Sequence, residues 1–506
     1  MAKQLTGDDL HELLKEQALL EENMALLSWD QLTGMPVKSG EFRAELMAYL
    51  TKRYLKVTTG KKAKALLDYY QLPNNQSTLS IDDQALFQRF SHDIKYVINV
   101  PADDYIAFER LKIMAQDAWA AAREKNDYAI FKPYLEKLIH MTKQLIPLWQ
   151  TDEQTPYDVL LGQYEQGLTT KKLDSIFNQV KQGLGALQQE LQLNGETPDN
   201  QFLHRSVPKG LQLRYIQPTI QRLGFDFERG RLDDTVHPFM QDMNRNDARI
   251  TTRWSDRDFK MAVLGLFHEA GHGMFAQNVD SKWDYTPFNK GIAMSIHESQ
   301  SLFNEVIIGQ DEAFWYHEYP KLQDIFGDVL ADISFEQFYD GWMKTEPTLI
   351  RTEADPLTYP LHIIIRYEIE KAIFNDDLDV SELPALWREK YRTYLGVVPE
   401  DDVTGILQDI HWADASFGYF PSYALGHLYA AQFRYAMNKE LDISSLLQSG
   451  DYQPLIDWRR NHIWQYGASK SPSDILLTAT GEPLNPNYWL DLQRKRYEKV
   501  YQVKVD

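Results

Sequence analysis

Two histidines and a glutamate form the clearest chemical pattern in the chain, the HEAGH stretch at residues 268–272. Residues four apart lie one turn apart on a helix, so His268 and His272 would present their imidazoles to the same side. Two neutral imidazoles so placed can hold a divalent cation of the zinc type, and Glu269 can take a proton from water at the open coordination position. Because this short pattern also occurs by chance in ordinary helices, its context decides what it means.

A catalytic zinc site usually has three protein ligands and leaves the fourth position to water. A second helix-like run at residues 291–309 is bounded by glycines and contains Glu298, with 25 residues between His272 and Glu298. This separation allows a turn and a second helix beside the first, so we expect His268, His272 and Glu298 to be the ligands. His297 is the competing ligand, but neighbouring helical residues point about 100° apart, so only one of the two can face the cation.

Six short motifs follow one another along the chain. They are HPF at 237–239, DARIT at 247–251, HEAGH at 268–272, HESQ at 297–300, IRTEAD at 350–355 and GILQDIHW at 405–412. All six, in this order, resemble the signature segments of the M32 metallocarboxypeptidases, as do LSWDQLTGMP at 27–36 and GYFPSYALG at 418–426. The resemblance covers essentially the whole chain. It implies a mostly α-helical metallopeptidase divided by a deep, narrow substrate groove, usually as a homodimer.

Peptide hydrolysis also needs a donor that stabilises the tetrahedral oxyanion. His411 and Tyr423 are the candidates, on stretches punctuated by glycine and proline. Tyr419 is as plausible as Tyr423 on the sequence alone. A histidine beside Trp412 could instead be a hydrogen-bonded core residue, but the family resemblance favours the functional interpretation of His411.

A carboxypeptidase must recognise the free terminal carboxylate of its substrate, and a guanidinium group matches a carboxylate in bidentate geometry. Arg351 in IRTEAD is the first candidate and Arg249 in DARIT is the second. The structural alternative is an ion pair with Glu353, Asp355 or Asp247, since arginines often make such pairs.

Two more residues are expected near the site. His237 in HPF would narrow one end of the groove. Metal-bound histidines usually donate from their other ring nitrogen to an outer acceptor, and Glu305, two turns beyond Glu298, is one candidate for that acceptor.

The elements that must position these residues are mainly helices. A first helix can be capped by Thr6 or Asp8, and apolar stripes at helical spacing predict further helices over residues 41–54, 61–70, 81–99, 101–125, 128–149 and 170–193. Residues 72–78 are predicted as a polar turn and 194–200 as a linker. Residues 201–207 and 248–254 are rich in β-branched and aromatic residues and predict a small sheet. We therefore expect one mostly α domain over 1–506, with a helical half at about 1–200 facing a metal-bearing half at about 201–506.

Composition limits the partners and the compartment. Asp and Glu number 73 against 53 Lys and Arg, a formal charge of -20, so nucleic acid is not expected as a partner. The chain has no cysteine, which excludes disulfides and thiolate ligands and fits a reducing cytosol. The first ten residues lack the apolar core of a signal peptide, and no apolar run approaches the ~18 residues of a membrane span. We expect a cytoplasmic protein without membrane contact.

The sequence therefore predicts a metal-dependent carboxypeptidase that releases single residues from peptide C-termini. One divalent ion per chain is expected, with zinc favoured and cobalt or manganese also suited to two histidines and a glutamate. The alternative is a helical oligopeptidase or dipeptidyl carboxypeptidase, which shares HExxH and a downstream glutamate. A non-catalytic binding protein with a structural metal is disfavoured, because closed structural sites use four protein ligands, usually with cysteine, and Glu269 would have no task there.

Overall fold

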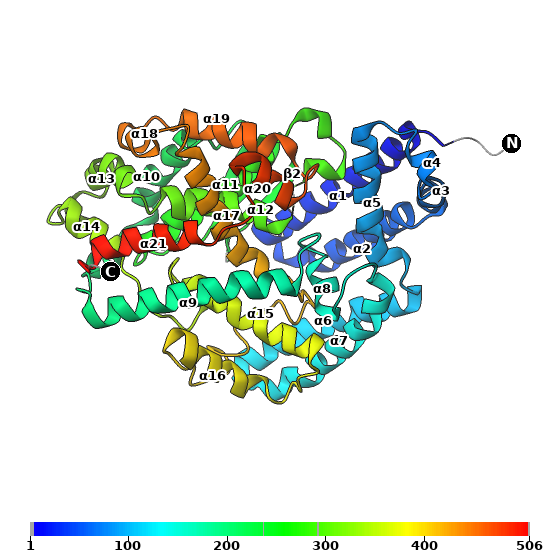
Figure 1. The fold of residues 1–506 in the computed structure, drawn as a ribbon, viewed down its shortest axis with the longest axis horizontal. Helices are drawn as coiled ribbons and strands as arrows, with labels where there is room; N and C mark the ends of the chain where they lie inside the picture. The colour runs from blue at the N-terminus through cyan, green and yellow to red at the C-terminus, as the bar shows by residue number, and fades with distance from the viewer. Residues whose placement is uncertain (1–4, 236, 291–292, 504–506) are drawn as a thin grey trace.

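Helices make up most of the molecule (Figure 1). The computed structural model describes residues 5–235, 237–290 and 293–503. The first part of the chain forms α1 (Gly7–Thr33), α2 (Gly40–Thr58), α3 (Lys61–Tyr70), α4 (Pro73–Gln76), α5 (Ile81–Ile98), α6 (Ala102–Lys125), α7 (Tyr128–Trp149), α8 (Pro156–Leu161) and α9 (Thr170–Asn194). The predicted helices of this part are confirmed. Of the two expected caps for α1, Thr6 is the N-cap, and its backbone N–H donates to Asp9 Oδ2 at 3.0 Å.

Two predictions of local structure were wrong, one in this part of the chain and one just after it. The expected polar turn at 72–78 contains the short helix α4, because Pro73 at the first helical position has a φ that suits a helix start. The expected strand at 201–207 begins with a 3₁₀ turn, η2 (Gln201–His204). Its adjacent side chains Phe202 and Leu203 are both buried, whereas a half-exposed strand would bury only one of two neighbours.

The second part of the chain contains the sheet and the remaining helices. Its strands are β1 (Gly230–Asp234), β2 (Met240–Asn244) and β3 (Asp247–Thr252). Its helices are α10 (Lys209–Arg222), α11 (Phe259–Gln277), α12 (Met294–Leu302), the π-helix η5 (Phe303–Ile308), α13 (Glu312–Phe326), α14 (Phe335–Trp342), α15 (Tyr359–Asn375), α16 (Leu383–Leu395), α17 (Pro421–Met437), α18 (Ile443–Ser449), α19 (Gln453–His462), α20 (Pro472–Thr480) and α21 (Asn487–Val500). Short 3₁₀ turns lie between these elements at Ser281–Trp283, Pro287–Asn289, Gly327–Val329, Arg351–Glu353 and Trp464–Tyr466, and another lies between α1 and α2 at Val37–Ser39.

The small sheet covers the helix that carries HEAGH. Its strand order is β1-β3-β2, with β1 parallel and β2 antiparallel to β3, and Ile250 of β3 opposite both Leu232 and Met240. Ala248 and Ile250 are fully buried, and β3 packs on α11. The strand predicted at 248–254 is thus confirmed as β3. The structure adds β1 and β2, whose polar sequences gave no strand pattern.

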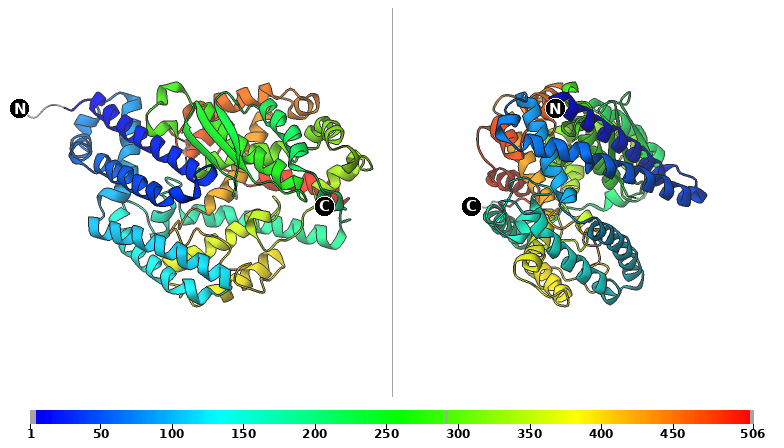
Figure 2. Two further views of the ribbon diagram at one scale, coloured as in Figure 1. Left: turned by 180° about the vertical axis from the view of Figure 1, so that it is seen from behind. Right: turned by 90° about the vertical axis from the view of Figure 1, so that its right-hand side faces the viewer.

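Helices from distant parts of the sequence pack around α9, which runs lengthwise through the molecule (Figure 1). It contacts α15 and α16 on one side and α21 on the other. Helix α1 lies along β2 beside the face of the sheet (Figure 2). Buried apolar side chains from Leu10 to Val503 form one connected core. Within the described residues, no helix combines the length and the apolar character that crossing a membrane requires.

Candidate metal centre

HEAGH lies in the interior of the protein because α11 is apolar on nearly every side. Asp258 caps this helix by accepting from the backbone N–H of Met261 at 3.0 Å. Leu266, Phe267 and Met274 are fully buried around the motif. The two histidines project to one side, with 3.2 Å between Nε2 of His268 and Nε2 of His272. The four-residue spacing thus produces the pair of imidazoles that it predicts.

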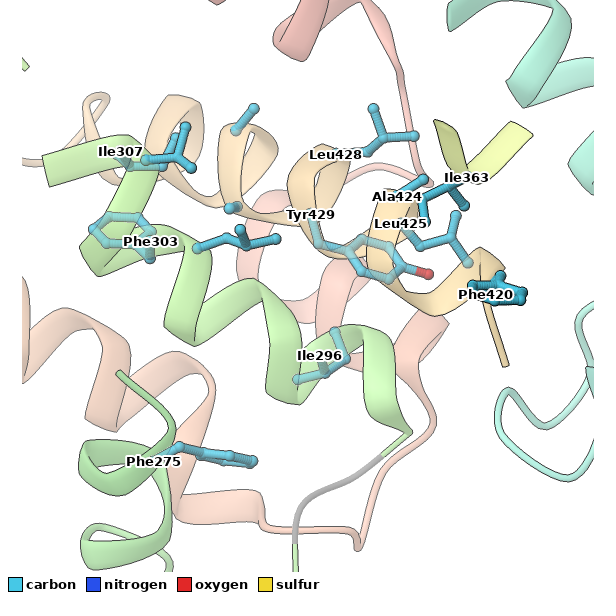
Figure 3. Close-up of a cluster of buried hydrophobic side chains, with 14 of the residues drawn as sticks. Phe275, Ile296, Phe303, Ile307, Ile363, Phe420, Ala424, Leu425, Leu428 and Tyr429 are labelled. Atoms are coloured by element: carbon cyan, nitrogen blue, oxygen red, sulfur yellow. The ribbon is translucent and has the colours of Figure 1, made fainter. Parts of the chain in front are cut away.

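A glycine brings the second helix close to this pair. A Cβ on Gly271 would lie 2.4 Å from the backbone oxygen of Gln300 and 2.6 Å from Cα of Ser301, so only glycine allows α12 to approach α11 so closely. Apolar side chains then fill the space around α12, among them Phe275, Ile296 and Phe303 (Figure 3). Close packing of α11 against α12 therefore sets the position of Glu298.

Glu298 completes a three-residue cluster. Its Oε1 lies 3.7 Å from Nε2 of His268 and its Oε2 lies 3.5 Å from Nε2 of His272. One ligand atom from each of the three residues lies within 4.8 Å of the others, an arrangement that can hold a metal ion. Residues 291 and 292, at the start of the predicted helical run, lie outside the described residues, and α12 begins at Met294.

Two residues outside the three-residue cluster contact the Nδ1 atoms of the histidines. Oε2 of Glu305 lies 2.8 Å from Nδ1 of His268, and Nδ1 of His297 lies 2.5 Å from Nδ1 of His272. The competing candidate His297 therefore contacts Nδ1 of His272 and not the ligand nitrogen Nε2. Glu298, the residue after His297, belongs to the cluster. Because Nδ1 of His268 is bonded to Glu305, Nε2 is the nitrogen of this ring that can bind a cation once it has lost its proton.

The electrostatics of the cluster favour a positive charge among these side chains. Burial by itself would lower the pKa of His268, but the carboxylates of Glu298 and Glu305 outweigh burial and raise this pKa to about 10. Burial, His297 and His268 hold the pKa of His272 well below its usual value, so this imidazole is neutral and able to bind a metal. The donor set therefore fits a divalent cation of the zinc type.

Glu269 is buried beside the cluster, with 8% of its surface exposed. Burial raises the pKa of its carboxyl to about 7, with a further contribution from Glu298 and Glu305 against the opposing effect of His268. A carboxyl group whose pKa lies near neutrality can both accept and return a proton at physiological pH.

His411 and Tyr423 lie together in a second group of side chains. The Tyr423 hydroxyl is 3.4 Å from Nε2 of His411, and the guanidinium carbon of Arg351 is 4.9 Å from the centre of the Tyr423 ring. Burial lowers the pKa of His411 to about 4, so its imidazole is neutral at pH 7 and can donate one hydrogen bond. Tyr419 packs edge-on against Tyr423 at 5.1 Å and belongs to the same group, because its ring centre lies 5.6 Å from that of His411, against 6.1 Å for Tyr423. The hydroxyl contact with His411 and the ring contact with Arg351 are what single out Tyr423.

Arg351 makes an ion pair, but with a partner that the sequence did not indicate. Its Nε and Nη2 donate to Oδ1 of Asp409 at 3.0 and 2.9 Å, and its Nη1 donates to the Tyr359 hydroxyl at 2.7 Å. Arg366 binds the other oxygen of Asp409 through Nε at 2.7 Å. The two guanidinium groups hold the pKa of Asp409 far below its usual range against the effect of burial. Arg351 keeps N–H groups on Nη1 and Nη2 for a further acceptor.

Arg249 lies at a cleft between α1 and the sheet, and Phe239 of the HPF segment contacts Trp29, which lines the same cleft. The guanidinium of Arg249 binds Asp247 through two parallel bonds of 2.7 and 2.8 Å, which is one of the structural ion pairs considered from the sequence. It also packs on the ring of Trp29, which Phe239 contacts edge-on at 5.3 Å. His237 is exposed. The cleft has a volume of ≈ 450 Å³ and is lined by Trp29, Asp30, Thr33, Gly34, Arg231, Leu232, Asp233, Asp234 and Arg249.

Sequence reasoning missed three residues of the Arg351 group: Asp409, Arg366 and Tyr359. Asp409 stands two positions before His411 in GILQDIHW, so a search for an acidic partner within that motif could have found it. Arg366 is fully buried, and a charged residue in the apolar stretch of α15 is the signal for it. Tyr359 carries no comparable signal.

A mostly helical fold, an HExxH helix and a glutamate on the adjacent helix define a metallopeptidase site of the HExxH class. Residues 9–497 match the model of the carboxypeptidase Taq (M32) metallopeptidase family. The chain is 40% identical to carboxypeptidase 1 of Bacillus subtilis (strain 168) over 97% of this chain and 98% of that protein. It is 34% identical to thermostable carboxypeptidase 1 of Thermus thermophilus over 99% of this chain and 100% of that protein.

The solved structures agree with the sequence relatives. The crystal structure of an M32 carboxypeptidase from Deinococcus radiodurans R1 superposes with a TM-score of 0.94 at 31% identity, covering 98% of this chain and 99% of that one. The chain therefore belongs to the M32 metallopeptidase family, and it is a metallocarboxypeptidase. The family resemblance and the helical fold predicted from the sequence are confirmed.

Proposed function

We propose that His268, His272 and Glu298 hold one divalent ion, with zinc as the first choice and cobalt or manganese as substitutes, and that the enzyme releases single amino acids from peptide C-termini. The observation that carries this proposal is the grouping of the three ligand atoms within 4.8 Å, with Glu269 buried beside them. Two imidazoles and a carboxylate suit a catalytic zinc site that keeps one position open.

His268, His272 and Glu298 would hold the cation, which would supply Lewis-acid chemistry by polarising the scissile carbonyl and lowering the pKa of water. Glu269 accepts the proton of the attacking water and returns it to the leaving amine, a role that suits its pKa of about 7. His411, neutral at pH 7, and Tyr423 donate hydrogen bonds to the developing oxyanion. Tyr423 is preferred to Tyr419, because its hydroxyl lies near His411 and its ring lies under Arg351.

Recognition of the terminal carboxylate falls first to Arg351. This residue lies in the same group as His411 and Tyr423. Burial raises the pKa of Glu298, and the charge of Arg351 acts against that rise, so the guanidinium is electrostatically coupled to the metal cluster. The N–H groups that Asp409 and Tyr359 do not use are available to a substrate carboxylate. Arg249 is the second candidate, since it lines the cleft beside α1, and His237 would narrow the same end of the groove.

The alternative, an oligopeptidase or dipeptidyl carboxypeptidase, is not favoured by the family and its relatives. Product analysis tests the proposal. A tripeptide with a blocked N-terminus should yield free single amino acids in the presence of the metal. Release of an unblocked dipeptide or of internal fragments would contradict the proposed removal of single residues, which leaves a dipeptide that still carries the blocking group.

The setting of the enzyme completes the proposal. Peptides with a free C-terminus are the substrates. The working form is a cytoplasmic homodimer. Each chain forms one peptidase domain over residues 1–506, with a division into two halves near residue 200. The absence of cysteine supports a reducing compartment, and the family resemblance supports the dimer. Light scattering measures the mass in solution, and a monomer at working concentration would contradict the dimer.

A further inference from the structure

A buried carboxylate outside the metal cluster connects the first part of the chain to two helices of the second. Glu165 follows α8 and has 2% of its surface exposed. Its carboxylate accepts the backbone N–H of Ser295 at 2.7 Å, the hydroxyl of Ser295 at 2.6 Å and the hydroxyl of Ser422 at 2.8 Å. These bonds span 130 residues to Ser295 and 257 residues to Ser422.

Both helices that Glu165 contacts begin without a cap from their own N-cap side chain. The N-cap of α12 is Ala293 and that of α17 is Phe420, and neither side chain can accept a hydrogen bond. The first backbone N–H groups of a helix need acceptors from outside the helix. Glu165 is such an acceptor for α12, through the N–H of Ser295. At the start of α17 the N–H groups of Ser422 and Tyr423 bond to the backbone oxygens of Tyr419 and Phe420, and Glu165 accepts the hydroxyl of Ser422 instead.

The direction of the two helices makes a negative charge favourable at this point. Helices α12 and α17 pack side by side and run the same way (Figure 3). The hydrogen bonds to Ser295 and Ser422 place Glu165 at the start of both. Their partially positive N-terminal ends therefore meet, and a carboxylate between them offsets the repulsion. Burial raises the pKa of Glu165 to about 7, while the bonds from Ser295 and Ser422 act in the opposite direction.

Each helix carries a site residue within one turn of the cap. Glu298 follows Ser295 by three residues, and Tyr423 directly follows Ser422. The two helices also meet at Glu298 itself, since a Cβ on Gly426 of α17 would lie 2.7 Å from Cγ of Glu298. A shift of either helix start would move a proposed metal ligand or the proposed oxyanion donor.

We propose that Glu165 is a positioning residue for the metal centre: it caps α12 through the Ser295 N–H and anchors the first turn of α17 through the Ser422 hydroxyl, and so fixes the placement of Glu298 against His268 and His272, and of Tyr423 against His411. This inference rests on the proposed function, because it takes Glu298 as a metal ligand.

Cobalt binding provides the test, because the visible spectrum of bound Co²⁺ reports the coordination geometry without turnover. The apo forms of wild type, Glu165→Ala, Glu165→Gln and Ser422→Ala are titrated with Co²⁺ against a competing chelator. The matched control is Glu318→Gln on α13, a fully buried glutamate that binds Arg222, Lys321 and Tyr452 away from the site. Thermal unfolding of every variant measures the purely structural cost.

We expect Glu165→Ala to bind Co²⁺ at least about 10-fold more weakly and with a changed spectrum, as is typical when an outer residue that orients a ligand is lost. Glu165→Gln should lie between it and wild type, because the amide can keep the hydrogen bonds without the charge. Ser422→Ala should keep Co²⁺ affinity and lose kcat, since only the helix of Tyr423 is released. Glu318→Gln should lower the unfolding temperature and leave the spectrum unchanged.

Wild-type affinity and spectrum in folded Glu165→Ala, or in Glu165→Gln if the alanine variant does not fold, would overturn the inference. An equal loss of Co²⁺ affinity in Glu318→Gln would overturn it too, because the effect would then be general destabilisation. Failure of wild type itself to bind Co²⁺ would overturn the proposed metal site, and the inference with it.

Discussion

Replacing Arg351 tests how the enzyme recognises a free C-terminus. This guanidinium has structural partners of its own, Asp409 and Tyr359, so Arg351→Ala should reduce kcat/KM on every substrate. A charge-assisted contact to the substrate carboxylate would add about 1.5–3 kcal/mol, or about one to two decades in rate, only when that carboxylate is present. The structural loss and the recognition loss therefore separate on a pair of substrates.

The assay is a two-by-two comparison of wild type and Arg351→Ala on the free-acid and amidated forms of one peptide. We expect a coupling of about 10- to 100-fold between the two changes. Arg351→Lys should also be impaired, because lysine keeps the charge but loses the bidentate geometry of the guanidinium. Arg249→Ala is the matched control at the second candidate. If the reductions in kcat/KM caused by Arg351→Ala and by amidation simply multiply, Arg351 has only a structural role. A coupling between Arg249→Ala and amidation would then assign recognition of the carboxylate to Arg249.

Three further predictions concern the metal cluster. Glu298→Ala should lose metal and activity together, whereas His297→Ala should retain metal. Metal titration of both variants tests this, and loss of metal from His297→Ala alone would make His297 the ligand in place of Glu298. Glu305→Gln should weaken metal binding by about 10- to 100-fold because the partner of His268 loses its charge, and unchanged affinity by chelator competition would exclude this role. Gly271→Ala should lower the unfolding free energy by at least about 1–3 kcal/mol and weaken metal binding, because its Cβ meets the α12 backbone. Gly265→Ala on the same helix is the control, because a Cβ there would meet open space, and it should raise the unfolding free energy by up to about 1 kcal/mol. Equal changes in unfolding free energy for Gly265→Ala and Gly271→Ala, measured by urea unfolding, would contradict the packing argument.

Helical periodicity predicted which residues could share the metal cluster but left His297 and Glu298 as alternatives, and the usual ligand set of a catalytic zinc site favoured Glu298. The phase of α11 places His268 and His272 on one side, and the 100° step between neighbours allows only one of His297 and Glu298 to face them. Periodicity also gave the long helices, whose apolar stripes are regular. These features depend on residues close together in the chain, where local geometry determines direction.

Contacts between distant segments could not be predicted in this way. Arg351 binds Asp409 across 58 residues, and the candidates considered from the sequence were near neighbours or an aspartate of the sheet. Strands β1 and β2 are held by pairing with β3, although their own sequences are too polar to show alternation. The segment at 201–207 has strand-like composition, but tertiary packing buries Phe202 and Leu203 together in a 3₁₀ turn.

The central claim is that Glu269 moves the proton while His268, His272 and Glu298 hold the metal. The most direct measurement is the metal content and the kcat of Glu269→Gln, prepared beside wild type without added metal. We expect wild-type metal content and a fall in kcat of about 10²- to 10⁴-fold, because glutamine keeps the shape but cannot accept the proton. Retention of more than about a tenth of the wild-type kcat with the metal in place would contradict it.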